Sequence, residues 1–416
     1  MHGYAKLNAF IHMKVSILCI GDELLNGRTL NTNATWIGKK LSELGCIVSS
    51  QVVVPDNEKS IMLALKNLVN SKLDFVIITG GLGPTDDDIT RQALFKFFNS
   101  STTFDYKYWS QLKKRFKKFQ KKIPEINKNQ AIIPTNGLVI KNPIGSARGL
   151  QYKLNKTTFF SLPGVPSEMK RMIKDKIIPW LVKYELEPKN IRIIRTTGIP
   201  ESLLVEELSE VIKKNPGCDI GYYPSILGVD IYLSAYNRNL IKKLFDSIMK
   251  KQLKNIYACG EDSIEKVLIK KLKEKKMSIS VAESCTGGLI QNRLTDISGS
   301  STVYKGGMVA YSNTIKIKIL KVKEKIIGKF GAVSKQTAEE MAKNIRILYD
   351  TDIGLSVTGV AGPDGGSVDK PVGIVYISIS TKMGIKTVKK QFWENRINNK
   401  IRISQAGLNF LRLSLQ

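Results

Sequence analysis

Short apolar runs alternate with longer amphipathic segments, and this pattern predicts an α/β protein. From Met13 onward it predicts strands over 14–20, 47–54 and 75–79, separated by helices over 33–44 and 59–70. Such alternation is typical of a parallel sheet with helices on both faces. Every apolar run stays far below the roughly 20 residues that a membrane-spanning helix needs. We therefore expect no association with a membrane.

The pattern changes twice along the 416 residues, a length that favours two or three domains. The middle of the chain has the order strand, helix, strand, strand, helix, which indicates a small α+β module. Strand–helix alternation then resumes. We predict an N-terminal extension over 1–12, an α/β domain over 13–172, a connecting module over 173–255 and a second α/β domain over 256–416.

The charge balance is strongly basic, with 65 Lys and Arg residues against 36 Asp and Glu and a formal net charge of +29. Such a charge first suggests nucleic acid or another anionic partner. However, lysine is spread along the chain together with many Ile and Asn residues, as expected of a genome rich in A and T. The densest basic segment, 109–122, also has apolar residues at helical spacing. We expect a packed helix with a solvated basic face there, and no specific nucleic-acid partner.

The start of the chain and its cysteines indicate the compartment. The first residues lack the continuous apolar segment of a secretory signal. The five cysteines are scattered, with no C-x-x-C pair to hold a zinc ion or an iron–sulfur cluster. Both features predict a reduced, cytoplasmic protein.

A serine at a strand-to-helix turn is the leading candidate nucleophile. Ser284 follows a short apolar strand over 277–282, and a helix opens just after it. Such a turn offers backbone N–H groups to a developing oxyanion. Both histidines precede the first strand, so the base must be another residue type, and Tyr311 and Lys316 follow nearby. Cys285 is the rival nucleophile, but an adjacent residue on such a turn points elsewhere. The residues of the turn expected to bind substrate are Thr286, Gly287 and Gly288.

A glycine-rich loop with three acids follows the strand over 75–79. Glycines at the carboxyl end of a parallel strand allow the backbone to approach a phosphate. Successive aspartates supply hard oxygen ligands for a divalent metal, although an acid there could instead stabilise a helix N-terminus. The loop after the first strand adds an acid at the same edge. The predicted residues are Gly80, Gly81 and Gly83 for phosphate, and Glu23, Asp86, Asp87 and Asp88 for the metal.

Two further loops follow strands and contain glycines that would allow a ligand to approach the backbone closely. The loop over 359–366 follows an apolar strand and carries only one acid, which favours phosphate binding by backbone N–H groups without a metal. Gly359 and Gly362 are its candidate substrate-binding residues, and Arg396 could add a bidentate contact unless it is simply a surface arginine. In the N-terminal domain, Asn142 begins the loop over 142–149 and is a further candidate for substrate binding.

Taken together, these segments resemble the CinA (competence/damage-inducible) protein family over nearly the whole chain from Met13. The N-terminal motifs are Gly-Asp-Glu-Leu-Leu at 21–25, Thr-Gly-Gly-Leu-Gly-Pro-Thr-Asp-Asp-Asp at 79–88 and Leu-Pro-Gly-Val-Pro at 162–166. The C-terminal motifs are Ala-Glu-Ser-Cys-Thr-Gly-Gly at 282–288, Tyr-Ser-Asn at 311–313, Gly-Ala-Val-Ser at 331–334 and Thr-Gly-Val-Ala-Gly-Pro-Asp-Gly-Gly at 358–366. Two segments depart from the family pattern: the usual Gly-Thr-Ala-Pro-Gly reads Gly-Ser-Ala-Arg-Gly at 145–149, and Arg28 stands in place of a glutamine.

The resemblance implies a fold for each part of the chain. It implies a molybdopterin-binding-like, three-layer αβα domain at the N-terminus, a KH-like α+β connecting module, and a C-terminal α/β amidohydrolase domain. A KH domain that binds nucleic acid needs a Gly-x-x-Gly loop. Residues 191–253 contain none.

The resemblance also implies two activities, in a homodimer that serves pyridine nucleotide salvage. The C-terminal domain would hydrolyse nicotinamide mononucleotide to nicotinic acid mononucleotide and ammonia without a cofactor. The N-terminal domain would be an ADP-ribose pyrophosphatase that needs Mg²⁺, Mn²⁺ or Co²⁺, with Asp88 as the first candidate for its essential acid and Asp87 as the second. A nucleotide- or pterin-binding domain without turnover is the alternative for that half. Matched residue by residue, the family's C-terminal site comprises the nucleophile Ser284 with Tyr311, Lys316, Thr358 and Arg396.

Overall fold

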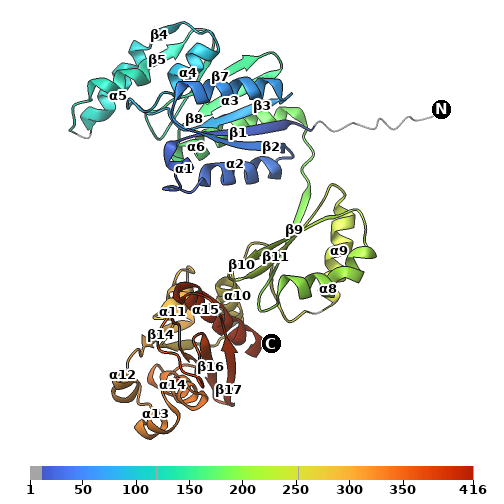
Figure 1. Ribbon diagram of the computed structural model, residues 1–416, viewed down its shortest axis with the longest axis vertical. Helices are drawn as coiled ribbons and strands as arrows, with labels where there is room; N and C mark the ends of the chain where they lie inside the picture. The colour runs from blue at the N-terminus through green and yellow to red at the C-terminus, as the bar shows by residue number, and fades with distance from the viewer. Residues whose placement is uncertain (1–11, 119, 252, 416) are drawn as a thin grey trace, which may run out of the picture. The chain divides into compact units, whose positions relative to one another are not determined.

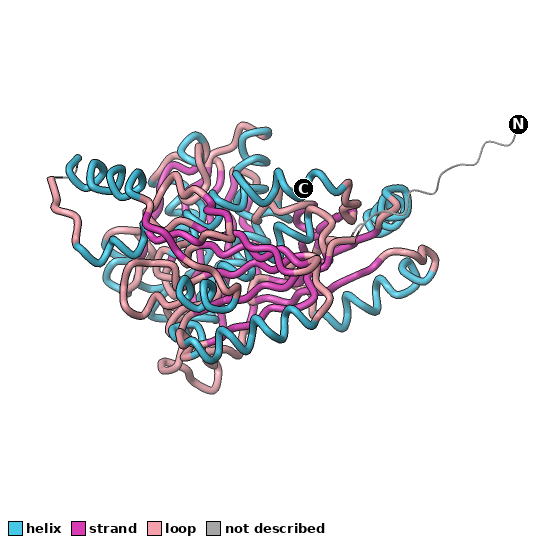
Figure 2. The backbone as a smooth tube through the Cα atoms, turned by 90° about the horizontal axis from the view of Figure 1, so that it is seen from above, coloured by secondary structure: helices cyan, strands magenta, loops and turns pink. Residues whose placement is uncertain are grey.

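The computed structural model describes residues 12–118, 120–251 and 253–415, so the predicted extension over 1–12 lies outside the described residues except for His12. The chain forms two compact units, one ending at Lys189 and the other beginning at Asn190. Most of the helices and strands are labelled in Figure 1, and Figure 2 distinguishes helices, strands and loops by colour.

The first unit is built around a six-stranded sheet in the order β2-β1-β3-β8-β7-β6, in which β6 and β7 run antiparallel to their neighbours. Its strands are β1 (Lys14–Ile20), β2 (Ile47–Val54), β3 (Phe75–Thr79), β4 (Thr102–Phe104), β5 (Ile132–Pro134), β6 (Leu138–Ile140), β7 (Gly149–Leu154) and β8 (Thr157–Leu162). Its helices are α1 (Asp22–Leu25), α2 (Thr32–Glu43), α3 (Glu58–Asn70), α4 (Thr90–Phe97), α5 (Tyr106–Lys118), η1 (Glu125–Ala131), α6 (Pro166–Met172), η2 (Ile173–Ile177), α7 (Ile178–Leu181) and η3 (Val182–Tyr184).

The central strands of this sheet are buried on both faces, as the predicted three-layer arrangement requires. All five residues of β3 and all six of β8 are buried. One hydrophobic core packs α2 and α6 against one face, and a second packs α3 and α4 against the other. The fold prediction is therefore confirmed.

The first unit extends further along the chain than predicted. Ile173, Ile177 and Leu181 are buried in the same core as Ile17 of β1. The boundary predicted at residue 172 therefore moves to 189, because these helical turns cover the first sheet instead of joining the connecting module.

The register of the parallel strands brings three loops to one edge of the sheet. Cys19 of β1 pairs with Thr79 of β3, and Thr79 pairs with Leu162 of β8. The loops that follow these strands therefore begin side by side. Gly80 is required at this edge: its φ is +111°, and a Cβ there would lie 2.1 Å from the Ile20 carbonyl oxygen.

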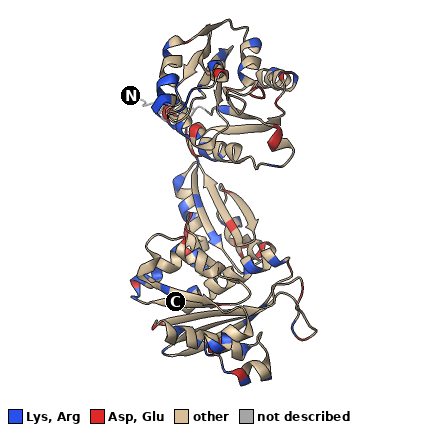
Figure 3. Ribbon diagram, turned by 90° about the vertical axis from the view of Figure 1, so that its left-hand side faces the viewer, with Lys and Arg blue, Asp and Glu red and all other residues tan. Residues whose placement is uncertain are grey.

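The basic segment near residue 109 forms a packed helix, as predicted. In α5, Trp109 and Leu112 are buried in a small core, whereas Lys113, Lys114 and Lys117 are exposed. Figure 3 shows Lys and Arg distributed over helices and strands throughout the chain. Among residues 12–118, 120–251 and 253–415, no helix is both long and apolar enough to cross a membrane.

The second unit begins with the connecting module, a four-stranded antiparallel sheet in the order β10-β11-β9-β12. A single core packs its two helices against the sheet through residues such as Ile194, Leu204 and Leu244. The predicted order strand, helix, strand, strand, helix is confirmed, and β12 adds an edge strand. Its elements are β9 (Asn190–Thr196), α8 (Glu201–Lys213), β10 (Asp219–Ser225), β11 (Gly228–Ala235), α9 (Arg238–Lys250) and β12 (Ile256–Cys259).

The C-terminal domain is an α/β domain around a sheet in the order β14-β13-β15-β16-β17. β14, β13 and β15 are parallel, and β16 and β17 are antiparallel. Its strands are β13 (Ile279–Glu283), β14 (Tyr304–Val309), β15 (Ile353–Gly359), β16 (Ile374–Thr381) and β17 (Gly384–Gln391). Its helices are α10 (Ile264–Glu274), α11 (Leu289–Thr295), η4 (Ser300–Thr302), α12 (Asn313–Lys318), α13 (Glu324–Phe330), α14 (Lys335–Leu348) and α15 (Arg396–Ser414).

Helices cover both faces of this sheet. Residues of α10, α11 and α15 form the larger core with β13, β15 and β16. The opposite face packs against α14 through Met341 and Ile345. The turn that carries Ser284 lies where β13 ends and α11 begins.

Candidate active site

Ser284 occupies the predicted strand-to-helix turn. It is 7% exposed, and its backbone N–H donates to the Val357 carbonyl of β15 at 3.0 Å. Gly287 and Gly288 follow with φ of +63° and +93°. Only glycine adopts this left-handed region readily, so the two glycines allow the chain to reverse directly behind the serine.

The carboxylate of Glu283 organises the turn. It is fully buried and accepts hydrogen bonds from the backbone N–H groups of Gly288 (3.1 Å), Ile290 (3.1 Å) and Gln291 (2.9 Å). The N–H groups at the start of α11 therefore already have an acceptor, contrary to the expectation that they would serve an oxyanion. The carboxylate closes the turn by satisfying donors that a helix start leaves unpaired.

Lys316 lies directly beside the serine, on α12. Its side chain is 2% exposed, and Nζ lies 3.0 Å from Ser284 Oγ, 2.8 Å from the Ala310 carbonyl oxygen and 3.1 Å from the Tyr311 carbonyl oxygen. Burial lowers the pKa of the Lys316 ammonium from its ordinary value, opposed by a smaller effect of Cys285. The structure thus supplies the desolvation that a lysine base needs.

The three contacts of Nζ are compatible with both protonation states of the lysine. A neutral lysine has two N–H donors and one lone pair. When the two donors point to the carbonyls of Ala310 and Tyr311, the lone pair faces Ser284 Oγ and can accept its proton. A protonated lysine has no lone pair and can only donate a hydrogen bond to the serine.

Of the other predicted residues, Tyr311 lies in the connection between β14 and α12, Arg396 at the start of α15 and Thr358 in β15. Arg396, at the start of α15, donates from Nη2 to the Tyr311 hydroxyl at 2.8 Å and from Nη1 to the Gly362 carbonyl at 2.6 Å. Thr358 of β15 is buried and donates to the Ala332 carbonyl at 2.8 Å. Gly359 lies against β16, where a Cβ would be 2.5 Å from the Ile374 carbonyl oxygen.

The two neighbours of Ser284 on its C-terminal side are buried, with different consequences. Burial raises the pKa of the Cys285 thiol to about 12, so the reactive thiolate is disfavoured. Thr286 is fully buried, and its hydroxyl has no hydrogen-bond partner within the described part of the chain. Cys285 is therefore a poor rival nucleophile.

The N-terminal unit has its own cleft, of about 470 Å³, at the edge where β1, β3 and β8 end. Gly80, Gly81 and Gly83 line it, as predicted. Burial raises the pKa of the Asp56 carboxyl. The backbone amide of Asp22 donates to this carboxylate at 3.0 Å and lowers the pKa, whereas the nearby carboxylates of Asp22, Glu23 and Asp87 raise it further. The acids that line the cleft are Glu23, Asp56, Asp87, Asp88 and Glu168.

The four predicted metal ligands do not form one metal cage. Asp88 Oδ1 accepts from the Gly83 N–H at 2.8 Å, and Asp88 Oδ2 accepts from the Thr85 N–H at 3.0 Å, so this carboxylate closes the glycine loop. Asp86 is exposed and does not line the cleft. Across the described ranges, no group of three or more His, Cys, Asp or Glu side chains could hold a metal ion. Glu23 and Asp87 do line the cleft.

Two residues of the loop over 142–149 serve the structure of the loop itself. The Asn142 side chain accepts from the amides of Ile144 and Gly145 and donates to Glu168, and it does not line the cleft. Arg148 is buried, donates to Asp105 at 2.7 Å and stacks 3.6 Å above the Tyr108 ring. Asn142, which the sequence predicts to bind substrate, therefore does not face the cleft, and neither does Arg148.

Sequence reasoning missed the roles of Glu283 and Asp56, although both left a signal. Glu283 is an acid at the end of an otherwise apolar strand, where a buried carboxylate needs several donors. Asp56 follows β2 just as Gly21 follows β1, so it reaches the same edge of the sheet. A search for acidic residues at, or just after, the carboxyl ends of the predicted strands would have indicated both residues.

Removal of the Glu283 carboxylate should loosen the turn. We expect Glu283→Ala to lower the free energy of unfolding by about 3 kcal/mol or more, since each buried donor left unpaired costs about 1–3 kcal/mol. Hydrogen exchange of the amides of Gly288, Ile290 and Gln291 should accelerate. The exposed Asp364→Asn is the matched control and should change the free energy of unfolding by less than about 0.5 kcal/mol. Unchanged exchange in Glu283→Ala would contradict this role.

Three family models match successive parts of the chain. "Probable molybdopterin binding domain" matches residues 16–183, "Damage-inducible protein CinA KH domain" matches 191–258, and "CinA C-terminal domain" matches 261–415. These ranges agree with the observed end of the first unit and with the inclusion of β12 in the connecting module.

Full-length relatives and solved structures carry the same family name. The chain is 38% identical to a competence-damage inducible protein of Caldicellulosiruptor bescii over 96% of this chain and 98% of the relative, and 37% identical to a CinA-like protein of Kosmotoga olearia over 97% and 99%. A crystal structure of a competence/damage inducible protein from Agrobacterium tumefaciens is 35% identical over 36% of this chain and 93% of its own, with a TM-score of 0.36. With this similarity along its whole length, the chain belongs to the CinA family.

Proposed function

We propose that the C-terminal domain hydrolyses the carboxamide of nicotinamide mononucleotide to nicotinic acid mononucleotide and ammonia. The observation that carries this proposal is the contact of 3.0 Å between Ser284 Oγ and Nζ of the buried Lys316. A nucleophile beside a base with a lowered pKa is what amide hydrolysis requires. The substrate is the one that the family resemblance implies, and pyridine nucleotide salvage by a homodimer is part of the same proposal.

In the first half of the reaction, Ser284 Oγ attacks the carboxamide carbon while neutral Lys316 takes the hydroxyl proton. The oxyanion that forms needs donors, and most amides of the turn already donate to Glu283 or to carbonyls of the turn. We assign this role to the amides of Cys285 and Thr286. Lys316 then gives its proton to the amide nitrogen, the C–N bond breaks, and ammonia leaves an ester on Ser284.

In the second half, a water molecule attacks the ester carbon and Lys316 takes one of its protons. The C–O bond to Ser284 breaks, and the proton returns to the serine oxygen. The product is the carboxylic acid, and the enzyme is restored. Arg396 and Tyr311 supply a guanidinium and a phenol joined at 2.8 Å beside this centre, which suits the anionic phosphate of the nucleotide.

We further propose that the N-terminal cleft binds ADP-ribose as its complex with a divalent cation and hydrolyses the pyrophosphate. The observation that favours this function is the group of acids that faces Gly80 and Gly81, because these carboxylates repel a bare pyrophosphate. Mg²⁺ is usually held by one or two carboxylates together with substrate phosphates. Glu23 and Asp87 would supply such oxygens when Mg²⁺, Mn²⁺ or Co²⁺ enters with the substrate, whereas Asp88 shapes the loop.

The nucleophile can be tested by comparing two adjacent residues. Ser284→Ala should lower kcat for ammonia release from nicotinamide mononucleotide by about 10³-fold or more, since it removes the attacking atom. Cys285→Ala should keep most of the activity, because the thiol is buried and protonated. The assay is run with and without a chelator, and no metal requirement is expected. Equal losses in the two variants would exclude Ser284 as the nucleophile.

The pH dependence tests Lys316 as the base. The base must be neutral, and a lysine is neutral above its pKa. Because burial lowers that pKa, kcat/KM should rise with pH and level off below pH 10.5, the ordinary value for lysine. Lys316→Arg keeps the cation but cannot deprotonate, so it should be inactive across the whole range. The exposed Lys318→Met on the same helix should retain the profile, and an unaltered profile in Lys316→Arg would contradict the assignment.

The N-terminal activity can be separated from the C-terminal one by substitution. ADP-ribose turnover should require an added divalent cation and survive Ser284→Ala, since the two sites lie in different units. Asp87→Asn, in the cleft, should lower turnover by about tenfold or more. The neighbouring Asp86→Asn, outside the cleft, should change it little. No turnover with Mg²⁺, Mn²⁺ or Co²⁺ would reduce this domain to a binding module.

A further inference from the structure

A second cleft in the C-terminal unit lies apart from the residues around Ser284. It has a volume of about 910 Å³ and lies between the connecting module and the C-terminal domain. Its lining includes none of Ser284, Lys316, Tyr311 or Arg396. An inference from this cleft therefore does not rest on the proposed amidase.

The two walls of this cleft are held together by hydrogen bonds. Arg412 of α15 donates from Nη1 to the Ile256 carbonyl at 3.1 Å and from Nη2 to the Lys254 carbonyl. From the other side, Arg195 of β9 donates to the Glu261 carbonyl at 3.3 Å. The cleft is thus a feature of one compact unit.

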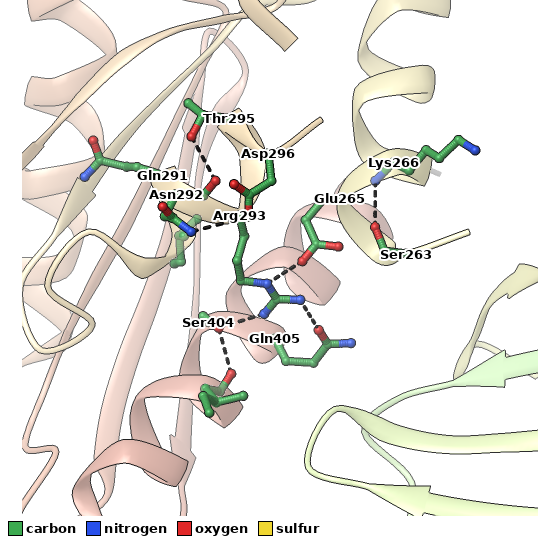
Figure 4. Close-up of polar contacts among 12 residues, drawn as sticks. Ser263, Glu265, Lys266, Gln291, Asn292, Arg293, Thr295, Asp296, Ser404 and Gln405 are labelled. Carbon is green, nitrogen blue, oxygen red and sulfur yellow. Dashed lines mark hydrogen bonds and ion pairs between the residues drawn. The ribbon is translucent and has the colours of Figure 1, made fainter. Parts of the chain in front are cut away.

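A buried glutamine in this cleft has an unused amide group. Gln405 of α15 is 3% exposed, and its Oε1 accepts from Arg293 Nη2 at 2.6 Å. Figure 4 shows the Gln405 amide nitrogen pointing away from Arg293. Since a guanidinium can only donate, the oxygen of Gln405 must face it, and the position of Nε2 is fixed. Nε2 has no hydrogen-bond partner within the described part of the chain.

Arg293 itself is held firmly, so Gln405 cannot easily turn. The guanidinium also donates to Glu265 and, at 2.7 Å, to Ser404 Oγ, which ties α10, α11 and α15 together (Figure 4). The free N–H groups of Gln405, a residue that lines the cleft, therefore stay turned away from Arg293. A buried donor without an acceptor is costly, and a ligand that brings an acceptor removes that cost.

The charged residues that line the cleft favour one kind of hydrogen-bond acceptor on a ligand. Lys386 and Lys390 of β17 line it together with Arg402, against a single acid, Glu201. The Arg402 guanidinium pairs with Glu394 through Nη2 at 3.1 Å, whereas its Nε is buried without a partner in the described chain. Positive charge beside unpaired N–H donors favours an anionic oxygen.

The remaining walls are apolar. Phe392 and Phe410 line the C-terminal side of the cleft, and Ile199, Ile226 and Leu227 line the side of the connecting module. Ligand sites commonly combine such a surface with a few fixed polar groups. A ligand here would bury a hydrocarbon body and present its charged end to Gln405 and the lysines.

We propose that this cleft is a binding site for an organic carboxylate with an apolar body. The carboxylate oxygens accept from Gln405 Nε2 and lie near Lys390, and the hydrocarbon part contacts Phe392, Phe410 and Leu227. This is a binding function separate from both hydrolytic sites.

The alternation of side chains along β17 provides a matched control. Lys386, Val388 and Lys390 line the cleft, whereas Thr387 and Lys389 line a different pocket on the other face of the strand. Lys389→Glu and Lys390→Glu therefore change the net charge equally, and only the second changes the cleft.

The test measures fluorescence of anilinonaphthalene sulfonate bound to the full chain and its displacement by octanoate, with octanol as the uncharged control. Lys390→Glu should weaken octanoate binding by about tenfold, equivalent to about 1.4 kcal/mol. Lys389→Glu should leave it within about twofold. Gln405→Glu keeps an acceptor for Arg293 but repels the carboxylate, so it should also weaken octanoate and leave octanol unchanged. Ser284→Ala should bind like the unaltered chain.

Three outcomes would overturn the proposal. The first is that neither the fluorescent anion nor octanoate binds to the unaltered chain. The second is that the two lysine variants weaken octanoate equally, which would indicate attraction by overall charge. The third is that octanol displaces the probe as well as octanoate does, which would mean that the cleft recognises only apolar surface. Thermal unfolding of each variant verifies that it is folded.

Discussion

The C-terminal site depends on one buried carboxylate. The Glu283 carboxylate accepts hydrogen bonds from the N–H groups of Gly288, Ile290 and Gln291, and so fixes the turn between β13 and α11. Ser284 is the first residue of that turn, and its own amide is tied to Val357 of the neighbouring strand. A short turn held from both sides leaves the serine little freedom. The position of its Oγ relative to Lys316 follows from these backbone bonds.

Burial gives Lys316 the property that its proposed role as a base requires. An exposed lysine is protonated at neutral pH and cannot accept a proton. In this fold the β14–α12 connection places Nζ of Lys316 below the surface, with two carbonyl oxygens and Ser284 Oγ as its neighbours. The two carbonyls satisfy the neutral amine without adding a negative charge that would favour the ammonium form.

In both units the candidate site lies on glycine-containing loops at the carboxyl ends of parallel strands. The charges around the two sites differ. In the C-terminal domain, Lys316 lies beside the serine and the guanidinium of Arg396 donates to the Tyr311 hydroxyl, and under the proposed function this guanidinium suits an anionic substrate. In the N-terminal cleft, the glycine loop faces carboxylates, and Asp56 is protonated more readily because of burial and its acidic neighbours. These carboxylates would repel a bare anionic substrate.

The sequence by itself determined the order of the elements, because the spacing of apolar residues reports which face of each strand or helix is buried. It also singled out Ser284, Lys316, Tyr311 and Arg396 as candidate site residues. Only the tertiary structure decided how they meet, since Arg396 and Tyr311 are 85 positions apart and joined at 2.8 Å. The sequence predicts Asp88 as a metal ligand. In the structure its carboxylate instead holds the glycine loop closed, because the amides of Gly83 and Thr85 donate to its oxygens. A motif records which groups are present, whereas the partner of each oxygen and nitrogen is set by packing.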